Sequence, residues 1–240
     1  MQNKGDYMKT WKKIMFTCVL AIIAIITASC ATKKSVTPAA EVNGKNDSLT
    51  HTAENPIRIW GWSRDGKTGI SELSDSGGRG GIIIKTFIFD AVTDTVLWER
   101  NIDSFDYGDG YSGIPENEIT AFFYNFHSTC RQLFGIEVKE VRPVAPSGSA
   151  IKHNGRSYDF AVNSADEDED GMIRRYSVTV EAGGRTKTIL SKDTFLPALP
   201  KFSQYSISPL EERALIILRW SGFSESYGFV YAGCHLTVGF

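Results

Sequence analysis

The sequence predicts a mainly β protein, built of antiparallel sheets in a β-propeller-like or β-sandwich arrangement, with one amphipathic helix at residues 116–134. Three observations indicate this class. Alternating or β-branched runs are separated by Asp-Gly, Asn-Gly and Pro turns, which is typical of antiparallel hairpins. A single stretch has an apolar period of 3.6 residues. Residues 56–240, which are rich in aromatic side chains, follow a polar stretch and are long enough for one compact domain.

The first predicted strands follow one another closely. IRIWGWS (57–63) alternates along its length, and Asp65-Gly66 then forms a turn. IIIKTFIFD (82–90) is a β-branched run suited to a central strand, and VTDT turns the chain into VLWER. We expect a three- or four-stranded antiparallel unit over residues 57–100.

Alternation places Trp60 and Trp62 on the same face of the first strand. If exposed, this face could stack on a sugar or grip a peptide. If buried, the two rings would lie between packed sheets, which the usual burial of tryptophan favours.

The predicted helix lies in PENEITAFFYNFHSTCRQLFG. Pro115 suits its start and Gly135 its C-terminal cap. We expect its apolar stripe to pack on a sheet as core, and a partner-binding face is the alternative. The stripe contains Ile119, Phe122, Phe123, Phe126, Cys130, Leu133 and Phe134.

An acidic turn, NSADEDEDGMI, is the candidate metal site. Asp166, Asp168 and Asp170 precede a glycine with the D-x-D-x-D-G spacing of calcium loops, in which alternate carboxylates converge on the ion. Position twelve is Ser177 rather than a bidentate Glu, and both flanks are predicted strands, which excludes an EF-hand. The alternative is a solvated acidic hairpin tip without metal.

The C-terminal part repeats the plan of the first hairpin. YSISPLEERALIILRW (205–220) has apolar alternation, a turn with Pro209 and a second strand, and YGFVYAGCHLTVGF (227–240) supplies a last strand or pair. This plan resembles blades of β-propeller proteins and hairpins of uncharacterised predicted secreted bacterial proteins. The resemblance implies about four blade-like sheets, because 185 residues cannot supply six or seven blades of about 40 residues each. A β-sandwich with similar hairpins is the alternative.

The N-terminus has the order of a secretory signal. Lysines 9, 12 and 13 precede an uncharged run of fifteen residues, 14–28, and small residues follow. As a helix this run would be about 22 Å long, short of the roughly 30 Å hydrocarbon core. We expect residues 1–29 to be removed as a signal peptide, with translation starting at Met1 or Met8.

The end of this segment, TASC, resembles the lipobox of bacterial lipoproteins, although Thr27 stands where the family prefers Leu, Val or Ile. The resemblance implies cleavage before Cys30, a diacylglycerol on its thiol and a fatty acid such as palmitate on its amine. Two or three acyl chains anchor a protein firmly. Ala31, rather than Asp, implies the outer membrane of the cell envelope. Ordinary cleavage that leaves Cys30 a plain thiol is the alternative.

Residues 30–55 have almost no large apolar side chains, which predicts a flexible tether. The whole chain has 26 Lys and Arg and 28 Asp and Glu; without the four lysines and one aspartate of residues 1–29, it has 22 basic and 27 acidic side chains. A net charge of −5 disfavours nucleic acid as a partner. Cys130 and Cys234 remain, either as a disulfide or as two buried free thiols.

The sequence has no H-E-x-x-H or G-x-S-x-G spacing, and its histidines at 51, 127, 153 and 235 are scattered. A Cys/His dyad stays possible on spacing alone, and structural histidine is the default. We therefore assign no catalytic residue and no cofactor other than the possible calcium. We expect a lipid-anchored envelope protein that binds or scaffolds an unidentified protein or glycan. The alternative is an envelope hydrolase with a site of scattered Asp, Glu and His.

Overall fold

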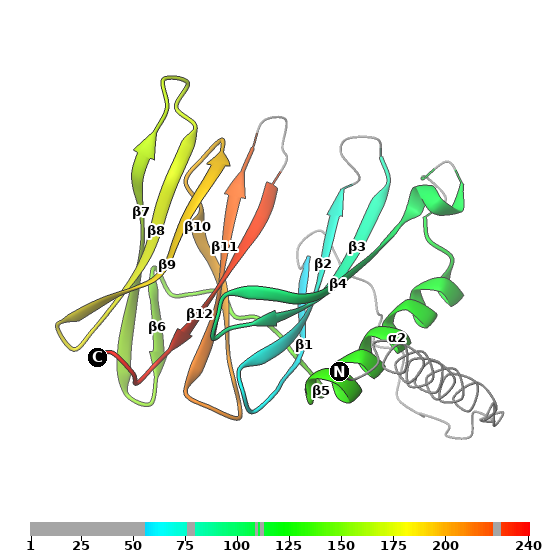
Figure 1. Ribbon diagram of the computed structural model, residues 1–240, viewed down its shortest axis with the longest axis horizontal. Helices are drawn as coiled ribbons and strands as arrows, with labels where there is room; N and C mark the ends of the chain where they lie inside the picture. The colour runs from blue at the N-terminus through cyan, green and yellow to red at the C-terminus, as the bar shows by residue number, and fades with distance from the viewer. Residues whose placement is uncertain (1–55, 76–79, 109, 111–112, 223–226) are drawn as a thin grey trace, which may run out of the picture. The chain divides into compact units, whose positions relative to one another are not determined.

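The computed structural model describes residues 56–75, 80–108, 110, 113–222 and 227–240, and it confirms the predicted fold class. Strands make up 59% of the structure and form three antiparallel sheets, and the described residues contain one α-helix (Figure 1). This part of the chain forms no closed barrel or propeller. The predicted signal peptide, residues 1–29, and tether, residues 30–55, lie outside the described residues.

The described strands form a helix-side sheet, a central sheet and an outer sheet. The helix-side sheet has the order β4-β3-β2-β1-β5, the central sheet β10-β11-β12 and the outer sheet β6-β7-β8-β9. Their strands are β1 Ile57–Trp62, β2 Lys67–Asp75, β3 Ile82–Asp90, β4 Thr95–Asp103, β5 Glu137–Val141, β6 Ala150–His153, β7 Arg156–Glu167, β8 Ile173–Ala182, β9 Arg185–Leu196, β10 Lys201–Ile207, β11 Arg213–Ser221 and β12 Tyr227–His235. A 3₁₀ helix, η1 Ser104–Tyr107, follows β4, and the α-helix is α2 Glu116–Phe134.

The helix-side sheet is the antiparallel unit that the sequence predicts. β1 and β2 pair across the Asp65-Gly66 turn, and β3 and β4 pair across the VTDT segment, with β5 added beside β1. In the second turn Asp94 has φ 55°, a left-handed conformation that Asp tolerates better than most residues. The carboxylate of Asp90 accepts a hydrogen bond from the Val92 N–H at 2.8 Å. This hydrogen bond and the left-handed conformation fix the backbone of the turn that carries Asp94.

Helix α2 covers one face of this sheet, as its apolar stripe predicts. Phe122, Phe123, Phe126 and Cys130 are buried there against side chains of the sheet. The helix ends at Gly135, which has φ 62° and donates its N–H to the carbonyl of Cys130. Leu133 departs from the prediction: it is 71% exposed, so the sheet does not cover that side of the last turn.

The prediction that Trp60 and Trp62 share a face is wrong. The β1–β2 register shifts between Ile59 and Gly61, and Gly61 has φ 142°. This bulge inserts one residue and reverses the alternation that follows it. Trp60 therefore packs beneath α2, where its indole N–H donates to Ser71 Oγ at 2.7 Å, and Trp62 packs toward the central sheet. Both rings are buried.

The central sheet is covered on both faces, which explains the unbroken apolar run of β11. Leu215 and Ile217 pack against the helix-side sheet. Ala214, Ile216 and Leu218 pack against the outer sheet. The sheets therefore pack face to face, as in a β-sandwich with a third sheet added.

Candidate functional site

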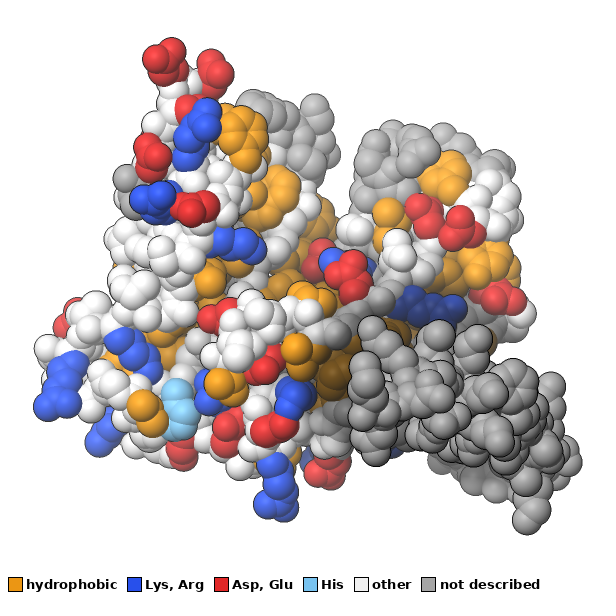
Figure 2. Space-filling model, viewed as in Figure 1, with side chains coloured by type: hydrophobic (Ala, Val, Ile, Leu, Met, Phe, Trp, Pro, Cys, Tyr) orange, Lys and Arg blue, Asp and Glu red, His pale blue; other side chains and the backbone are white. Residues whose placement is uncertain are grey.

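A cleft of about 740 Å³ lies where strands of all three sheets meet. Figure 2 shows a hollow between the side chains of the helix-side sheet and those of the other sheets, with hydrophobic side chains gathered in its depth. Both charged and aromatic residues line the cleft. They are Glu72, Lys85, Phe87, Phe89, Thr93, Asp94, Val96, Ile189, Leu190, Ser191, Lys192, Trp220, Gly228, Phe229, Val230 and Tyr231.

A partly buried acid–phenol pair forms one side of the cleft. Glu72 follows Ile70 on β2 with the two-residue spacing of one strand face, which directs it toward the central sheet. Tyr231 on β12 donates its hydroxyl to Glu72 Oε2 at 2.8 Å. Burial raises the pKa of Glu72, while the hydrogen bond from Tyr231 and the charge of Lys85 oppose the shift. Burial also raises the pKa of Tyr231 well above its ordinary value, so the phenol keeps its proton and remains the donor.

Two lysines, Lys85 and Lys192, supply positive charge to the lining of the cleft. Lys85 on β3 forms an ion pair of 2.8 Å with Glu99 on β4. Its ammonium also lies 5.4 Å from the centre of the Phe87 ring. Lys192, on β9, is exposed on the opposite wall. The cleft therefore has both signs of charge, with no large excess of either.

Asp94, in the turn between β3 and β4, also lines the cleft. Its Oδ1 accepts a hydrogen bond from the backbone N–H of Gly233 at 2.6 Å. Burial raises the pKa of Asp94 to about 6, although this hydrogen bond and the charge of Arg213 favour the ionised form. A side chain on Gly233 would not fit, because its Cβ would lie 1.8 Å from the carbonyl oxygen of Ala91. The turn at the end of β3 thus touches the backbone of β12.

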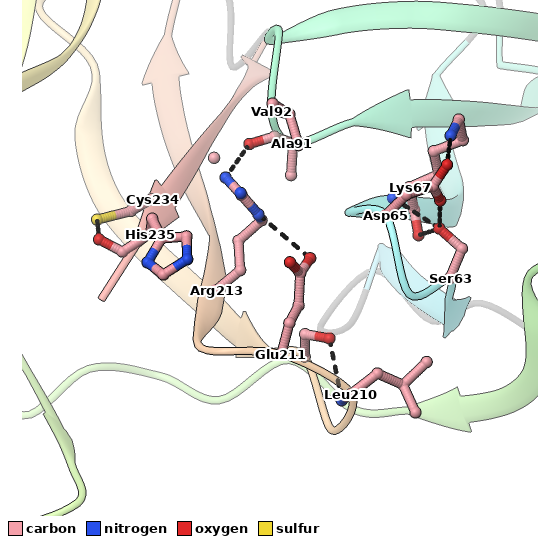
Figure 3. Close-up of polar contacts among 12 residues, drawn as sticks. Ser63, Asp65, Lys67, Ala91, Val92, Leu210, Glu211, Arg213, Cys234 and His235 are labelled. Carbon is pink, nitrogen blue, oxygen red and sulfur yellow. Dashed lines mark hydrogen bonds and ion pairs between the residues drawn. The ribbon is translucent and has the colours of Figure 1, made fainter. Parts of the chain in front are cut away.

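Arg213 holds this turn in place, as Figure 3 shows. From the start of β11 it donates through Nη1 to the carbonyl oxygen of Ala91 at 3.0 Å. Its Nε donates to Glu211 at 3.2 Å. Arg213 therefore links the central sheet to the turn that carries Asp94.

Aromatic rings form much of the remaining wall. Trp220 on β11 lies over Gly228, its cross-strand partner, so closely that a Cβ at position 228 would be 2.6 Å from the indole ring. The Trp220 and Phe229 side chains are partly buried. The ring centres of Phe87 and Tyr231 lie 5.2 Å apart in an edge-to-face arrangement. The absence of a side chain at Gly228 is thus what admits the tryptophan.

The free edge of β12 faces the cleft. β12 is outermost in the described central sheet, and it pairs with β11 through an unbroken register from residue 227 to 235. Just past the strand, Leu236 donates its N–H to the carbonyl of Glu212 at 2.8 Å, whereas the N–H of Gly233 points away from β11 to Asp94. Odd-numbered residues of β12 therefore direct their backbone groups outward, and Phe229 and Tyr231 direct theirs at the cleft.

The acidic turn predicted to bind calcium is held by its own hydrogen bonds. Asp168 Oδ1 accepts from the backbone N–H groups of Asp170 and Met172, and its Oδ2 pairs with Arg174 at 3.0 Å. Asp166 lies on β7 opposite Arg175. Across the ranges that the structure describes, no three acidic, His or Cys side chains are grouped to hold a metal ion. The calcium site stays a prediction, and the flanking strands β7 and β8 are confirmed.

Cys130 and Cys234 are free, buried thiols in separate clusters, so the structure does not bring the possible disulfide partners together. Burial raises their pKa values, to about 12 for Cys130 and about 11 for Cys234. His127 lies 4.6 Å from the Trp60 ring, centre to centre, and burial lowers its pKa to about 4. His153 instead pairs with Glu212 at 2.8 Å on the surface.

The predicted lipidation site, Cys30, lies outside the described residues. Within the described ranges, no helix combines the length and the hydrophobicity that crossing a membrane requires. Comparison of the chain with protein-family models, with curated proteins and with solved structures found no match.

The residues of the cleft are not predicted by any motif in the sequence. Glu72 and Tyr231 are separated by 159 positions, and only the pairing of sheets brings them together. A signal existed for Glu72, an acid on the inward face of a strand, and for Asp94, an acid within a recognised turn. Neither signal specifies a partner.

Proposed function

We propose that the protein is a lipid-anchored component of the cell envelope, held by acyl chains on Cys30, and that it binds a ligand in the cleft without chemical change. The cleft carries the binding part of this proposal. Its groups are already fixed by the protein itself, since Glu72 accepts from Tyr231 and Asp94 accepts from Gly233. Fixed donors and acceptors beside aromatic walls suit recognition, because little ordering is left to be done when a ligand enters.

The anchor is tested by matched cysteine variants of the full chain. Cys30→Ala should move the protein from the membrane fraction to the soluble fraction, and Cys18→Ala, within the predicted signal peptide, should leave it in the membrane fraction. Mass spectrometry should find acyl groups on Cys30 of the wild type. Membrane retention of Cys30→Ala equal to that of the wild type would contradict lipidation.

A hydrolase is the second candidate, because one observation favours it. Two carboxyl groups with raised pKa values, those of Glu72 and Asp94, line the same cleft, and such shifts are common where an acid or base acts in catalysis. The two candidates differ in the fate of the ligand. A ligand that is recovered with unchanged mass after release supports binding, and one recovered with a hydrolysed bond supports the hydrolase.

A further inference from the structure

We propose that the ligand of the cleft is a short, extended peptide segment that adds as a strand to the free edge of β12. This inference rests on the proposed function, namely that the cleft binds a ligand, and it names the ligand's class. The recognition groups are backbone N–H and C=O groups of β12 rather than side chains.

The lining of the cleft has the pattern of a strand edge. Four consecutive residues of β12, Gly228 to Tyr231, line it, although successive side chains point to opposite faces of a sheet. A space that opens onto the edge of a strand is lined by successive residues in this way, because it meets side chains of both faces. β9 does the same from the other wall, with four consecutive residues from Ile189 to Lys192.

The edge of β12 offers hydrogen-bonding groups at the spacing of a ladder. Because Gly233 points its N–H away from β11, Tyr231 and Phe229 do so as well. Their N–H and C=O groups match those of one antiparallel or parallel partner strand. Strand addition of this kind derives its affinity from main-chain hydrogen bonds and its selectivity from the pockets beside them.

Asp94 already occupies one position of the missing partner. Its carboxylate accepts from the N–H of Gly233 as a partner strand's carbonyl would, and Ala91 touches the same glycine. An added strand must therefore stop before Gly233 and run along the four residues 228–231 that line the cleft. Four residues of strand measure about 13 Å at roughly 3.3 Å each, so we expect an occupant of three to five residues in contact with β12.

The walls decide which kind of strand can enter. The edge of β12 lies between β9 and the faces of β2 and β3, so a single extended segment has access and the edge of another folded sheet does not. Glu72 and Asp94 balance Lys85 and Lys192, which favours a segment without strong net charge. Apolar side chains of the segment would alternate between the Trp220 wall and the Phe87 wall. The partner is therefore a flexible terminus or loop of another protein, rich in uncharged residues.

The probe is a phage-displayed library of random dodecapeptides, selected against the full chain. A selected peptide is then synthesised in its natural form and with single N-methyl groups placed along its backbone. Strand addition predicts that N-methylation weakens binding about tenfold at alternate positions and has little effect at the positions between, because only alternate N–H groups face β12. Equal tolerance of every N-methyl group would overturn the proposal.

Two variants of one residue test the protein's side of the ladder. Phe229→Pro removes the outward N–H and the phenyl ring, whereas Phe229→Ala removes the phenyl ring alone. Proline is tolerated on an edge strand where the N–H faces outward, and circular dichroism would verify that both variants fold. We expect Phe229→Pro to bind the selected peptide about tenfold more weakly than Phe229→Ala. Equal affinity of the two folded variants would contradict strand addition, and the N-methyl series decides the matter if Phe229→Pro does not fold.

A glycan array probed with the same protein separates this inference from the proposed function. Binding of a glycan that Trp220→Ala abolishes, with no peptide selected, would overturn strand addition and leave a binding cleft. Failure of both probes would count against the proposed function as well. A selected peptide with the alternating N-methyl pattern supports both.

Discussion

Replacement of Gly233 by alanine tests the close contact between the β3–β4 turn and β12. The new Cβ would lie 1.8 Å from the Ala91 carbonyl oxygen and 2.5 Å from its carbon. Both atoms are backbone, so β12 and the turn must separate. Such overpacking costs about 1–3 kcal/mol, and the hydrogen bond to the carboxylate of Asp94 adds about 1.5–3 kcal/mol if it breaks. Alanine also restricts the unfolded chain more than glycine does, and this offsets about 0.4–1 kcal/mol of the loss in stability.

The net loss of unfolding free energy is therefore about 3 kcal/mol, which corresponds to a fall in Tm of roughly 6–12 °C for a domain of this size. Thermal unfolding followed by circular dichroism measures it. Gly228→Ala is the matched control, because its Cβ meets the Trp220 side chain at 2.6 Å, and a partly exposed ring can move. A Gly233→Ala protein with a Tm within 2 °C of the wild type, or less destabilised than Gly228→Ala, would refute the contact.

Three further predictions follow from burial. The stability due to Asp94 should fall as the pH rises from about 4 through its pKa of about 6, because ionisation places a charge on a partly buried carboxyl. Asp94→Asn should remove that part of the Tm-versus-pH curve, and an unchanged curve would contradict the raised pKa. Phe126→Ala should lower the free energy of unfolding, measured in urea, by about 3–5 kcal/mol, whereas Tyr124→Ala, at a side chain 74% exposed, should lower it by under about 0.5 kcal/mol. Equal losses in the two variants would contradict the packing of α2. Cys130 and Cys234 should resist a thiol reagent at pH 8 until the protein unfolds, since both are buried with raised pKa values. Mass spectrometry locates the labelled residues, and rapid labelling of either cysteine in the folded protein would contradict their burial.

Local patterns predicted the elements of this fold well. The Asp65-Gly66 turn, the VTDT segment and the caps of α2 place hairpins and a helix where the structure has them, because each depends on a few neighbouring residues. The bulge at Gly61 is different. A glycine within an alternating run does not show that the register shifts, so Trp62 could not be assigned to its face from alternation alone.

The arrangement of the sheets and the cleft could not be predicted in the same way. The apolar run of β11 predicts a buried strand, but it does not indicate which sheets cover that strand. Likewise, Tyr231 and Glu72 meet only because the central and helix-side sheets pack face to face. A binding site at a strand edge is also hard to predict from sequence, because its recognition groups are backbone N–H and C=O groups, which nearly every residue has.

Backbone hydrogen exchange of the full chain without ligand tests most directly that β12 offers a free edge to the cleft. The amides of Val230 and Ala232 bond β11 and should be strongly protected, while those of Phe229 and Tyr231 face the cleft and should exchange much faster. Residue-resolved NMR measures all four amides in one experiment. Alternating protection along β12 is the result predicted here, and equal, strong protection of all four amides would contradict it.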